Sequence, residues 1–443
     1  MSVQHNTRTK VPLIFCIDLE PDTRAIDPHN RKDWLGFEAG WEPLQDWRGK
    51  LTKATGSQAH FSWYVRIDPQ VELTYGVADW AVTRYQSCFS LMQQAEDEIG
   101  VHPHSWRWLT AEAQWVSDFG DQAWVEHCVR QSLRCFEQQF GKPCRSFRFG
   151  DRWLNNETVA LLETLGVEFD LTIEPGRKQE ALSELFTGAI PDYRPAPRIP
   201  YRPAPADFLR CETGAAARNL WMIPISTASL HWACPMLSPE ARQQLKTPFW
   251  TSYQGWLDEV NEVWLQGWVY DARRPDETIY VDLWDGDELL ATYAADLLRE
   301  DLFRAGKGSG AHGFMIPVPE QKRDGRPHQM HVRVAGTSHE LRRSPYNAIW
   351  SADDPGEDYL TINLASNHSL FRRFCEALLQ EPQAPILNFI MRTDVFLHET
   401  LWATFDRNLN YLRTHPRVSD FVIATPAEAL AIWQRQTVGD TQT

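Results

Sequence analysis

The sequence predicts an α/β protein whose parallel strands are covered by outer helices, in a doubly wound or barrel arrangement, with a small all-β module inserted. Short apolar runs of strand length alternate with helical patterns over most of the 443 residues. The alternation stops between 256 and 345 and then resumes. We therefore expect residues 1–255 and 346–443 to form one domain and residues 256–345 to form an inserted β-sandwich.

The first predicted strand is the apolar run VPLIFCI at 11–17, and six comparable runs follow it: 60–67, 98–102, 145–149, 220–225, 386–391 and 420–424. Segments with apolar positions three and four residues apart predict helices between them: 76–97, 111–140, 155–165, 366–380 and 400–414. No strand is followed by G-x-G-x-x-G or G-x-x-x-x-G-K-[ST], which disfavours a nucleotide-binding version of the fold.

The segment 256–345 contains short runs that alternate with a period of two and are separated by Gly or Asp-Gly turns. They are VWLQGWVYDA, TIYVDLWDGDELLATYAAD, HGFMIPVP and HQMHVRVAG. This pattern is typical of an all-β module. The Pro-rich segment 191–208 predicts a long ordered loop, a flexible lid or a plain surface excursion.

Composition excludes several classes of protein. The chain has 44 Lys and Arg against 59 Asp and Glu, a net charge of −15, which argues against a general nucleic-acid surface. The apolar run at the N-terminus ends at Asp18 without a small-residue cleavage site, and no later stretch approaches the roughly 20 apolar residues of a membrane span. Eight cysteines without a C-x-x-C pair favour a reducing compartment, and we expect the cytoplasm.

Ionisable side chains follow the predicted strands in pairs spaced two residues apart, so both members of a pair lie on the same side. The pairs are Asp18 with Glu20 (followed by Asp22), Arg66 with Asp68, His102 with His104, and Arg392 with Asp394; further charges follow two other strands, namely Arg148, Asp151, Arg152, Asp170 and Glu174. Because the carboxyl ends of parallel strands carry the active site of an α/β barrel, we expect a polar site there.

The sharpest motif is EIGVHPHSW at 98–106, which places two histidines at one strand end. Two imidazoles and a carboxylate from the acidic DLEPD segment would form a ligand set for a catalytic zinc ion, and the same set suits cobalt or nickel. The alternative is a hydrogen-bonded histidine pair, or a pair of substrate contacts, without a metal.

The motifs FCIDLEPD, EIGVHPHSW, FRFGDRW and VEFDLT together resemble the ordered motifs of the polysaccharide deacetylase superfamily, the NodB-homology carbohydrate esterases. The resemblance covers residues 11 to about 230 and, more weakly, 355–435. It implies a distorted (β/α)7-type barrel, one divalent metal ion (zinc, with cobalt or nickel as alternatives), and a reaction that yields a free amine and acetate.

Carried over by motif, Asp18 resembles the catalytic base, and Arg148 the arginine that orients it. Glu20 stands where the family has a metal-binding Asp, and His102 matches the first metal-binding His. The family's second His would fall at Trp106, so His104 is the expected substitute, and the additional residue in DLEPD leaves Asp22 as a further possible ligand. Where the family has a His general acid, this chain offers Asp394, with His398 beyond it.

These features predict a metal-dependent hydrolase that removes an acyl group, N-acetyl in the simplest case, from a sugar in bacterial surface-glycan metabolism. The surplus of arginine suggests a uronic acid, an ulosonic acid or a phosphate-linked sugar, unless each arginine pairs with a neighbouring acid. The expected substrate contacts are Arg66, Asp68, Trp106, Arg107, Asp151, Arg152, Trp153, Asp170, Glu174 and Arg392.

Two other functions remain open. One is a glycoside hydrolase that uses two carboxylates of the same site, for example Asp18 and Asp170. The other is a non-catalytic glycan-binding protein on a barrel that has lost its metal. The insert resembles an accessory β-sandwich of glycosyltransferases and other surface-glycan proteins, which implies glycan binding or domain and subunit contacts, and hence a possible oligomer.

Overall fold

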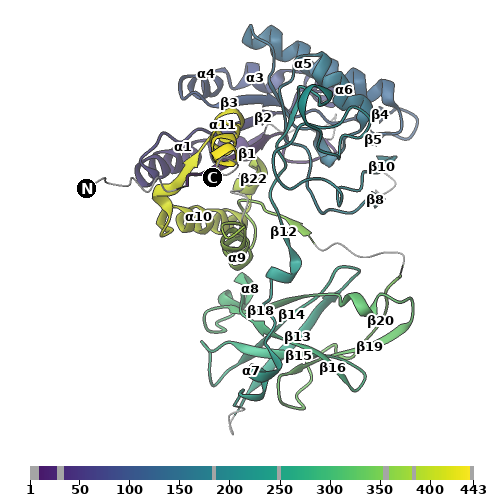
Figure 1. Cartoon of the computed structure of the whole chain (residues 1–443), viewed down its shortest axis with the longest axis vertical. Helices are drawn as coiled ribbons and strands as arrows, with labels where there is room; N and C mark the ends of the chain where they lie inside the picture. Colours follow the sequence, from purple (N-terminus) through teal and green to yellow (C-terminus); the bar gives the residue numbers. More distant parts are fainter. Residues whose placement is uncertain are drawn as a thin grey trace. The chain divides into compact units, whose positions relative to one another are not determined.

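The computed structural model describes residues 9–26, 34–181, 186–246, 251–352, 359–381 and 386–439. The chain divides into two compact units (Figure 1). Unit 1 comprises residues 1–227, 361–365 and 378–443, and unit 2 comprises residues 228–360 and 366–377. The segment 256–345, predicted as the insert, lies within unit 2.

Unit 1 is built on a parallel sheet of eight strands in the order β11-β7-β6-β3-β2-β1-β22, with β23 also paired to β1. The strands are β1 (Val11–Leu19), β2 (Ser62–Val65), β3 (Glu98–Val101), β6 (Ser146–Phe147), β7 (Phe169–Asp170), β11 (Trp221–Met222), β22 (Leu387–Arg392) and β23 (Phe421–Ile423). All nine residues of β1 are buried, as the continuous apolar run at 11–17 requires of a central parallel strand.

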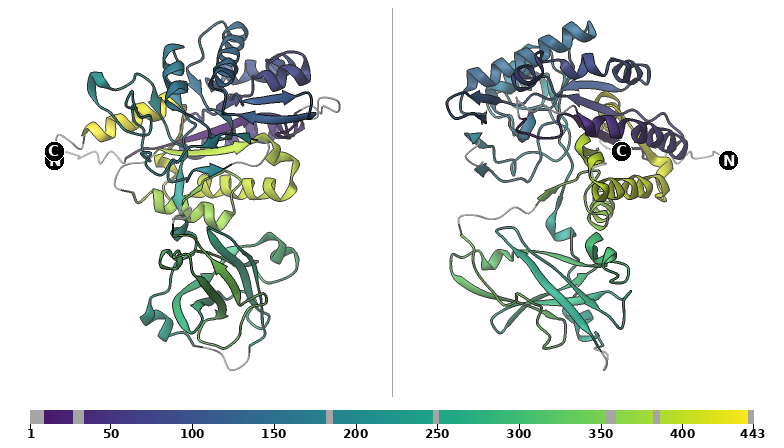
Figure 2. Two further views of the ribbon diagram at one scale, coloured as in Figure 1. Left: turned by 90° about the vertical axis from the view of Figure 1, so that its right-hand side faces the viewer. Right: turned by 180° about the vertical axis from the view of Figure 1, so that it is seen from behind.

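The helices of unit 1 lie outside this sheet (Figures 1 and 2). They are α1 (Leu35–Thr55), α2 (Pro69–Tyr75), α3 (Trp80–Arg84), α4 (Gln86–Gln94), α5 (Gln122–Phe140), α6 (Asn156–Thr164), α10 (Glu399–Thr414) and α11 (Pro426–Gly439), while α9 (His368–Leu378) falls mostly in unit 2. Helix α5 turns Val125, Val129 and Phe136 inward, the three-and-four spacing that predicted it.

The two ends of the sheet approach each other at Asn388 of β22. Its Nδ2 donates to the carbonyl oxygens of Ile223 and Pro224 at 3.2 Å, just after β11, and its backbone oxygen accepts from Ser226 N at 2.8 Å. Side chains of β1, β2 and β7 and of the segment after β11 share one buried apolar cluster. The strands therefore curl around a common interior, which gives the unit its barrel-like form.

The expected barrel-like α/β architecture is confirmed, but a regular set of seven strand–helix repeats is not. The sheet has eight strands, and a long loop instead of a helix connects β7 to β11. The Pro-rich segment 191–208 belongs to this loop and is an ordered element, with Tyr193 and Tyr201 buried.

Two helix predictions need correction. In the segment 111–140, residues Gln114–Asp118 form strand β5, which pairs with β4 (Trp106–Leu109) and brings Trp115 edge to face with Trp108. The helix begins only at Gln122, after its cap Asp121. The segment 76–97 breaks into α3 and α4 at Tyr85. Helices α1 and α11 were not predicted from the sequence.

Unit 2 contains two four-stranded antiparallel sheets, β13-β14-β18-β17 and β16-β15-β19-β20, which Figure 2 shows from two sides. The strands are β13 (Tyr253–Val260), β14 (Trp264–Asp271), β15 (Ile279–Asp285), β16 (Glu288–Ala295), β17 (Leu297–Leu298), β18 (Ala311–Pro317), β19 (Pro327–Val334) and β20 (Tyr346–Ile349). The predicted Asp-Gly turn joins β15 to β16, with Gly286 at a φ of 54°. Among the helices of the described ranges, none has the length and apolar character to span a bilayer.

Candidate metal centre

The carboxyl ends of β1, β2, β3, β6 and β22 bring their polar side chains to one place in unit 1. Asp18 lies opposite Arg392 in the pairing of β1 with β22, and His102 and Arg148 directly follow β3 and β6. A cavity of about 270 Å³ opens there. It is lined by Asp18, Glu20, Arg24, His102, His104, Arg148, Asp151, Arg152, Glu174, Arg177, Ile190, Thr361, Ile390 and Arg392.

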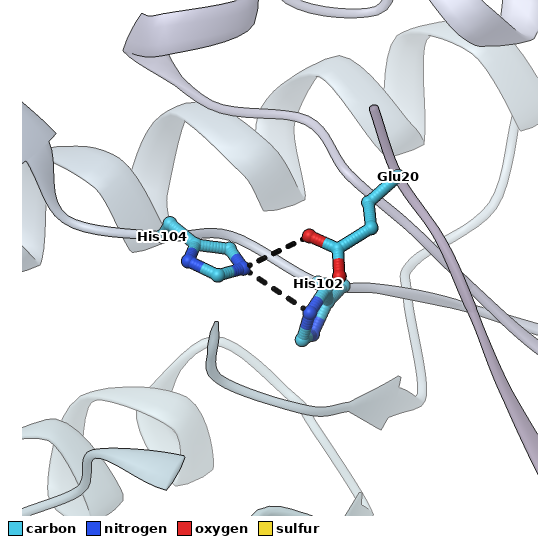
Figure 3. Close-up of side chains that lie close together, drawn as sticks. All are labelled: Glu20, His102 and His104. Atoms are coloured by element: carbon cyan, nitrogen blue, oxygen red, sulfur yellow. Dashed lines mark hydrogen bonds and ion pairs between the residues drawn. The ribbon is translucent and has the colours of Figure 1, made fainter. Parts of the chain in front are cut away.

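Glu20, His102 and His104 belong to the lining of the cavity, and their side chains lie close together (Figure 3). One ligand atom from each lies within 4.8 Å of the others, and all three side chains are buried. The His104 Nε2 atom is 3.3 Å from His102 Nε2 and 3.4 Å from Glu20 Oε2. His104, which lies two residues after His102 and not four, thus completes a compact group of two imidazoles and one carboxylate, as predicted.

The His102 ring is oriented by the backbone of the next strand. Its Nδ1 lies 3.0 Å from the carbonyl oxygen of Arg148, which can only accept a hydrogen bond, so Nδ1 carries the proton and Nε2 presents a lone pair to the cavity. Burial lowers the pKa of His102 to about 4. A neutral imidazole with a free Nε2 is the form that binds metal ions.

The His104 ring is oriented by Asp151, whose Oδ2 lies 3.0 Å from Nδ1. Although burial opposes it, the charge and hydrogen bond of His104 and the nearby Arg24 lower the pKa of Asp151 to about 2. Although burial and the charge of Arg66 oppose it, Asp151 and Glu20 raise the pKa of His104, which favours a protonated ring beside the ionised Asp151. The His104 Nε2 atom lies 3.3 Å from His102 Nε2 and 3.4 Å from Glu20 Oε2, so a divalent cation that displaces the proton of this ring would meet three ligand atoms.

The backbone around Asp151 is shaped for this contact. Asp151 and Arg152 adopt φ values of 53° and 59°, in the left-handed region that non-glycine residues rarely occupy. A Cβ atom on the preceding Gly150 would lie 2.2 Å from His104 Cδ2. The motif FRFGDRW therefore supplies space for the His104 ring and then a carboxylate that orients it.

We expect Asp151→Asn to weaken divalent-metal binding by about 10- to 100-fold, because the ring would lose the charged partner that fixes its orientation. Asparagine tolerates the left-handed backbone, so the fold should persist. Competition with a zinc-sensitive dye would measure the dissociation constant. Asp192→Asn, which removes the same charge from an ion pair with Arg194, is the matched control. An unchanged metal affinity in Asp151→Asn would show that the contact is incidental.

We expect Gly150→Ala to weaken metal binding and to cost about 1 to 3 kcal/mol of stability, because the added methyl group would displace the His104 ring. Thermal unfolding and the same dye competition would measure both effects. Gly49→Ala is the control, since a Cβ atom there meets nothing within 4 Å. If Gly150→Ala binds metal normally, the ring has more freedom than its packing indicates.

Glu20 presents an unsatisfied oxygen to the two imidazoles. Its Oε2 is buried without a hydrogen-bond partner among the described residues, and Arg66 Nη1 lies 3.5 Å away. Its Oε1 lies 2.7 Å from Arg392 Nε. Burial alone would raise the pKa of Glu20, but the charge of Arg392 and the contact with His104 hold it well below its usual range. Glu20 is thus an ionised carboxylate with one oxygen available to a cation.

Asp18 lies beside the trio and is held by Arg148. Arg148 Nε donates to Asp18 Oδ1 at 3.0 Å and Oδ2 at 3.2 Å, while Asp18 Oδ2 lies 3.8 Å from His102 Nε2. Both side chains are almost fully buried. The geometry gives a fixed carboxylate at the edge of the candidate metal site, which is where a base would be needed.

Four further residues line the cavity together, namely Glu174, Arg152, Arg177 and Thr361, and we call them the Glu174 wall. Arg152 Nη1 is 3.4 Å from Glu174 Oε2, and Thr361 Oγ1 donates to the same oxygen at 2.5 Å. Burial opposes ionisation here too, but Arg152, Arg148 and Arg177 lower the pKa of Glu174. Glu174 and Arg152 were expected substrate contacts, and the structure places both at the cavity.

Three acidic or basic residues of the first two strand ends have other partners. Asp22, a possible ligand by sequence, instead accepts hydrogen bonds from Leu35 N and Gly36 N, so it caps helix α1 and lies outside the trio. Asp68 accepts from Val71 N, His104 N and Arg66 Nε, which fixes the start of α2 and the His104 backbone. Arg66 is fully buried behind Glu20.

The remaining expected contacts lie outside the residues that line the cavity. Arg107 pairs with Asp118 and Asp121 and stacks on Trp124, and Trp153 stacks on Phe119 at 5.1 Å. Trp106 is buried with its Nε1 3.2 Å from His104 Nδ1. Asp394 Oδ1 lies 3.7 Å from Arg392 Nε, and the Asp394 side chain is partly exposed.

Asp170 is buried away from the cavity lining. Both of its oxygens accept from Thr172, and burial raises its pKa to about 7. A glycoside hydrolase that pairs Asp18 with Asp170 would need both carboxylates in the cavity, so the described structure favours no such pairing.

Five cavity residues were missed in the sequence: Arg24, Arg177, Ile190, Thr361 and Ile390. Arg24 reaches Asp151 at 3.2 Å from the segment after DLEPD, and Ile390 lies on the recognised strand β22. Thr361 enters 187 residues after Glu174, so no local pattern could have joined them.

No family model matches the sequence, and no curated protein matches it. Among solved structures, the chain is similar to a crystal structure of a "putative polysaccharide deacetylase" from Mycobacterium smegmatis, with 10% identity over 97% of this chain and 92% of the other, and a TM-score of 0.41. It is also similar to IcaB from Ammonifex degensii, with 12% identity over 41% of this chain and 91% of the other, and a TM-score of 0.21. The chemistry of the site follows from its own residues and not from these likenesses.

Proposed function

We propose that this protein is a metal-dependent hydrolase that removes an acyl group, N-acetyl in the simplest case, from a sugar that bears a negative charge. The observation that carries the proposal is the meeting of two imidazole Nε2 atoms and a buried carboxylate oxygen without a hydrogen-bond partner, beside an Asp18 that Arg148 holds. The motif resemblance to polysaccharide deacetylases supports the choice of substrate class.

Glu20, His102 and His104 would hold one divalent ion, and zinc is the first choice for two imidazoles and one carboxylate, with cobalt or nickel as alternatives. Such an ion, when bound, acts as a Lewis acid that polarises the amide carbonyl and lowers the pKa of water. Arg148 holds the Asp18 carboxylate in a fixed orientation at the edge of this site.

In this proposal Asp18 takes a proton from the attacking water as the oxygen bonds to the amide carbon. The carbon–nitrogen bond then breaks, and the proton passes from Asp18 to the leaving nitrogen, which gives acetate and a free amine. Asp18 serves in both directions because His102 and His104 are the only histidines among the described residues that line the cavity. Asp394, at the rim beside Arg392, stays an alternative proton donor.

We further propose a role in bacterial surface-glycan metabolism in the cytoplasm. All eight cysteines are free, and five of them are buried, which suits a reducing compartment. Unit 2 would contact glycan or a second copy of the chain.

The deciding experiment is metal removal and return on the full-length protein. Chelator-treated protein should release no acetate from N-acetylated sugars, and one equivalent of zinc per chain should restore release. Absence of a stoichiometric divalent ion after incubation with zinc, cobalt or nickel would refute the proposal. New reducing ends formed without metal would instead indicate a glycoside hydrolase.

A further inference from the structure

Arg392 is the last residue of β22 and faces the same cavity as the metal trio. In the pairing of β1 with β22 it lies opposite Asp18, and residues opposite each other on parallel strands direct their side chains to the same face of the sheet. Both side chains line the cavity. The candidate base and this guanidinium group therefore enter the cavity at the same level, from neighbouring strands.

The Arg392 guanidinium group has hydrogen-bonding capacity that the protein leaves unused. Its Nε lies 2.7 Å from Glu20 Oε1 and 3.7 Å from Asp394 Oδ1 in ion-pair contacts, but neither Nε nor Nη2 has a hydrogen-bond partner among the described residues. Arg148, in the same cavity, donates from Nε to Asp18 and from Nη1 to a backbone carbonyl oxygen. The exposed fraction of the side chain is 25% for Arg392 and 4% for Arg148. Because buried N–H groups without an acceptor are costly, an oxygen atom of a bound ligand would be favourable at Arg392.

The chemistry of the proposed hydrolysis limits what Arg392 can do. A guanidinium group keeps its proton in proteins, so Arg392 cannot be the proton donor to the leaving nitrogen. It can donate hydrogen bonds to an oxygen atom that becomes negatively charged. In amide hydrolysis this atom is the acyl oxygen. The carbonyl electron pair moves onto it as the water oxygen bonds to the carbon, and the pair returns as the carbon–nitrogen bond breaks.

We propose that Arg392 is a further catalytic residue, which donates hydrogen bonds to the acyl oxygen while that oxygen carries negative charge. This inference rests on the proposed function. Asp18 takes the proton from water and passes it to the leaving nitrogen, and Arg392 keeps all its protons throughout. Glu20 contributes one oxygen to each task, since its Oε2 lies 3.4 Å from His104 Nε2 and its Oε1 lies 2.7 Å from Arg392 Nε. The acetate product presents two oxygens, which a guanidinium group binds in parallel.

The kinetic test uses the zinc-treated full-length protein and 4-nitrophenyl acetate, because its acyl oxygen gains the same charge while its leaving group needs no proton. Arg392→Ala should lower kcat by about 10²- to 10³-fold, with a smaller change in KM and an unchanged zinc content. Arg145→Ala is the matched control, because it removes an arginine from a surface ion pair with Glu168, and it should keep full activity. Circular dichroism should show that both variants are folded.

A binding test does not depend on turnover. Methylphosphonate has the tetrahedral shape and the charged oxygens of the species formed by water attack. Calorimetry should show that it binds the zinc-treated wild type about 10- to 100-fold more tightly than Arg392→Ala, the size expected for charge-assisted hydrogen bonds. Arg392→Lys keeps the charge but not the planar fork, so it should keep its zinc and retain only part of this affinity.

Three results would each overturn the inference: full kcat in Arg392→Ala, loss of zinc together with loss of kcat, or equal methylphosphonate affinity in the wild type and Arg392→Ala. The second result would make Arg392 a positioning residue for Glu20. If the zinc-treated wild type hydrolyses neither the ester nor an N-acetylated sugar, the proposed function fails, and this inference fails with it. Hydrolysis that persists in Arg392→Ala refutes this inference alone.

Discussion

Asp18→Asn should lower the turnover of acetyl release by about 10²- to 10⁴-fold while the protein keeps its metal ion. The substitution preserves the size of the side chain and its place beside Arg148 Nε, 3.0 Å away, but an amide cannot accept a proton. Asp18 Oδ2 lies 3.8 Å from His102 Nε2, but Asp18 is not part of the group whose ligand atoms all lie within 4.8 Å of one another, namely Glu20, His102 and His104. Steady-state kinetics and metal analysis of the same preparation would separate these two effects.

Glu20→Gln is the informative companion to Asp18→Asn, because it should reduce metal content first and turnover as a consequence. If Asp18→Asn loses the metal instead, Asp18 is a ligand, and the role of base passes to another carboxylate, with Asp394 or Asp151 next. Full activity and full metal content in both variants would mean that the reaction takes place elsewhere.

The double substitution His102→Ala and His104→Ala should abolish metal binding, and with it all metal-dependent acetate release. Removal of both imidazoles leaves Glu20 as the one remaining member of the trio, and a single carboxylate does not hold zinc tightly. Metal content after dialysis against zinc, measured by mass spectrometry, is the direct readout.

The control for this variant replaces two exposed histidines, His127 and His231, with alanine. This protein should bind one zinc ion and release acetate at the original rate. Circular dichroism should show that both double variants are folded. Stoichiometric zinc in the His102/His104 variant would place the metal site outside the trio.

The site could be predicted from the sequence where strand geometry alone places side chains. Asp18 and Glu20, or His102 and His104, are two residues apart at strand ends, so alternation puts each pair on one side. The roles of Asp22 and Asp151 could not be read in this way. Asp22 caps a helix that the sequence analysis did not predict, and Asp151 reaches His104 only through a left-handed backbone.

The fold, too, has elements that the sequence predicts and elements that it does not. Apolar runs predicted β1, β2, β3, β6, β11, β22 and β23, whereas β7 has only two residues and was not among these runs. The apolar spacing of segment 111–140 predicted a helix that includes Trp115. Trp115 lies instead in strand β5, because pairing with β4 and contact with Trp108 outweigh the local preference for a helix. The Glu174 wall joins residues that are far apart in the sequence and that only the curled sheet brings together.

If His102 and His104 hold a metal ion, the stability of the folded protein, and with it the lifetime of the polypeptide, depends on the supply of metal. An ion that binds only the native state adds about 2.7 kcal/mol of stability when its free concentration is one hundred times the dissociation constant. Cells starved of zinc should therefore contain less of this protein, and the remaining protein should be less active. The reason is that a larger fraction of the metal-free protein is unfolded and accessible to proteases. Chelation during purification should lower the melting temperature of the protein. Metal binding by the trio would then influence how much of the protein a cell contains.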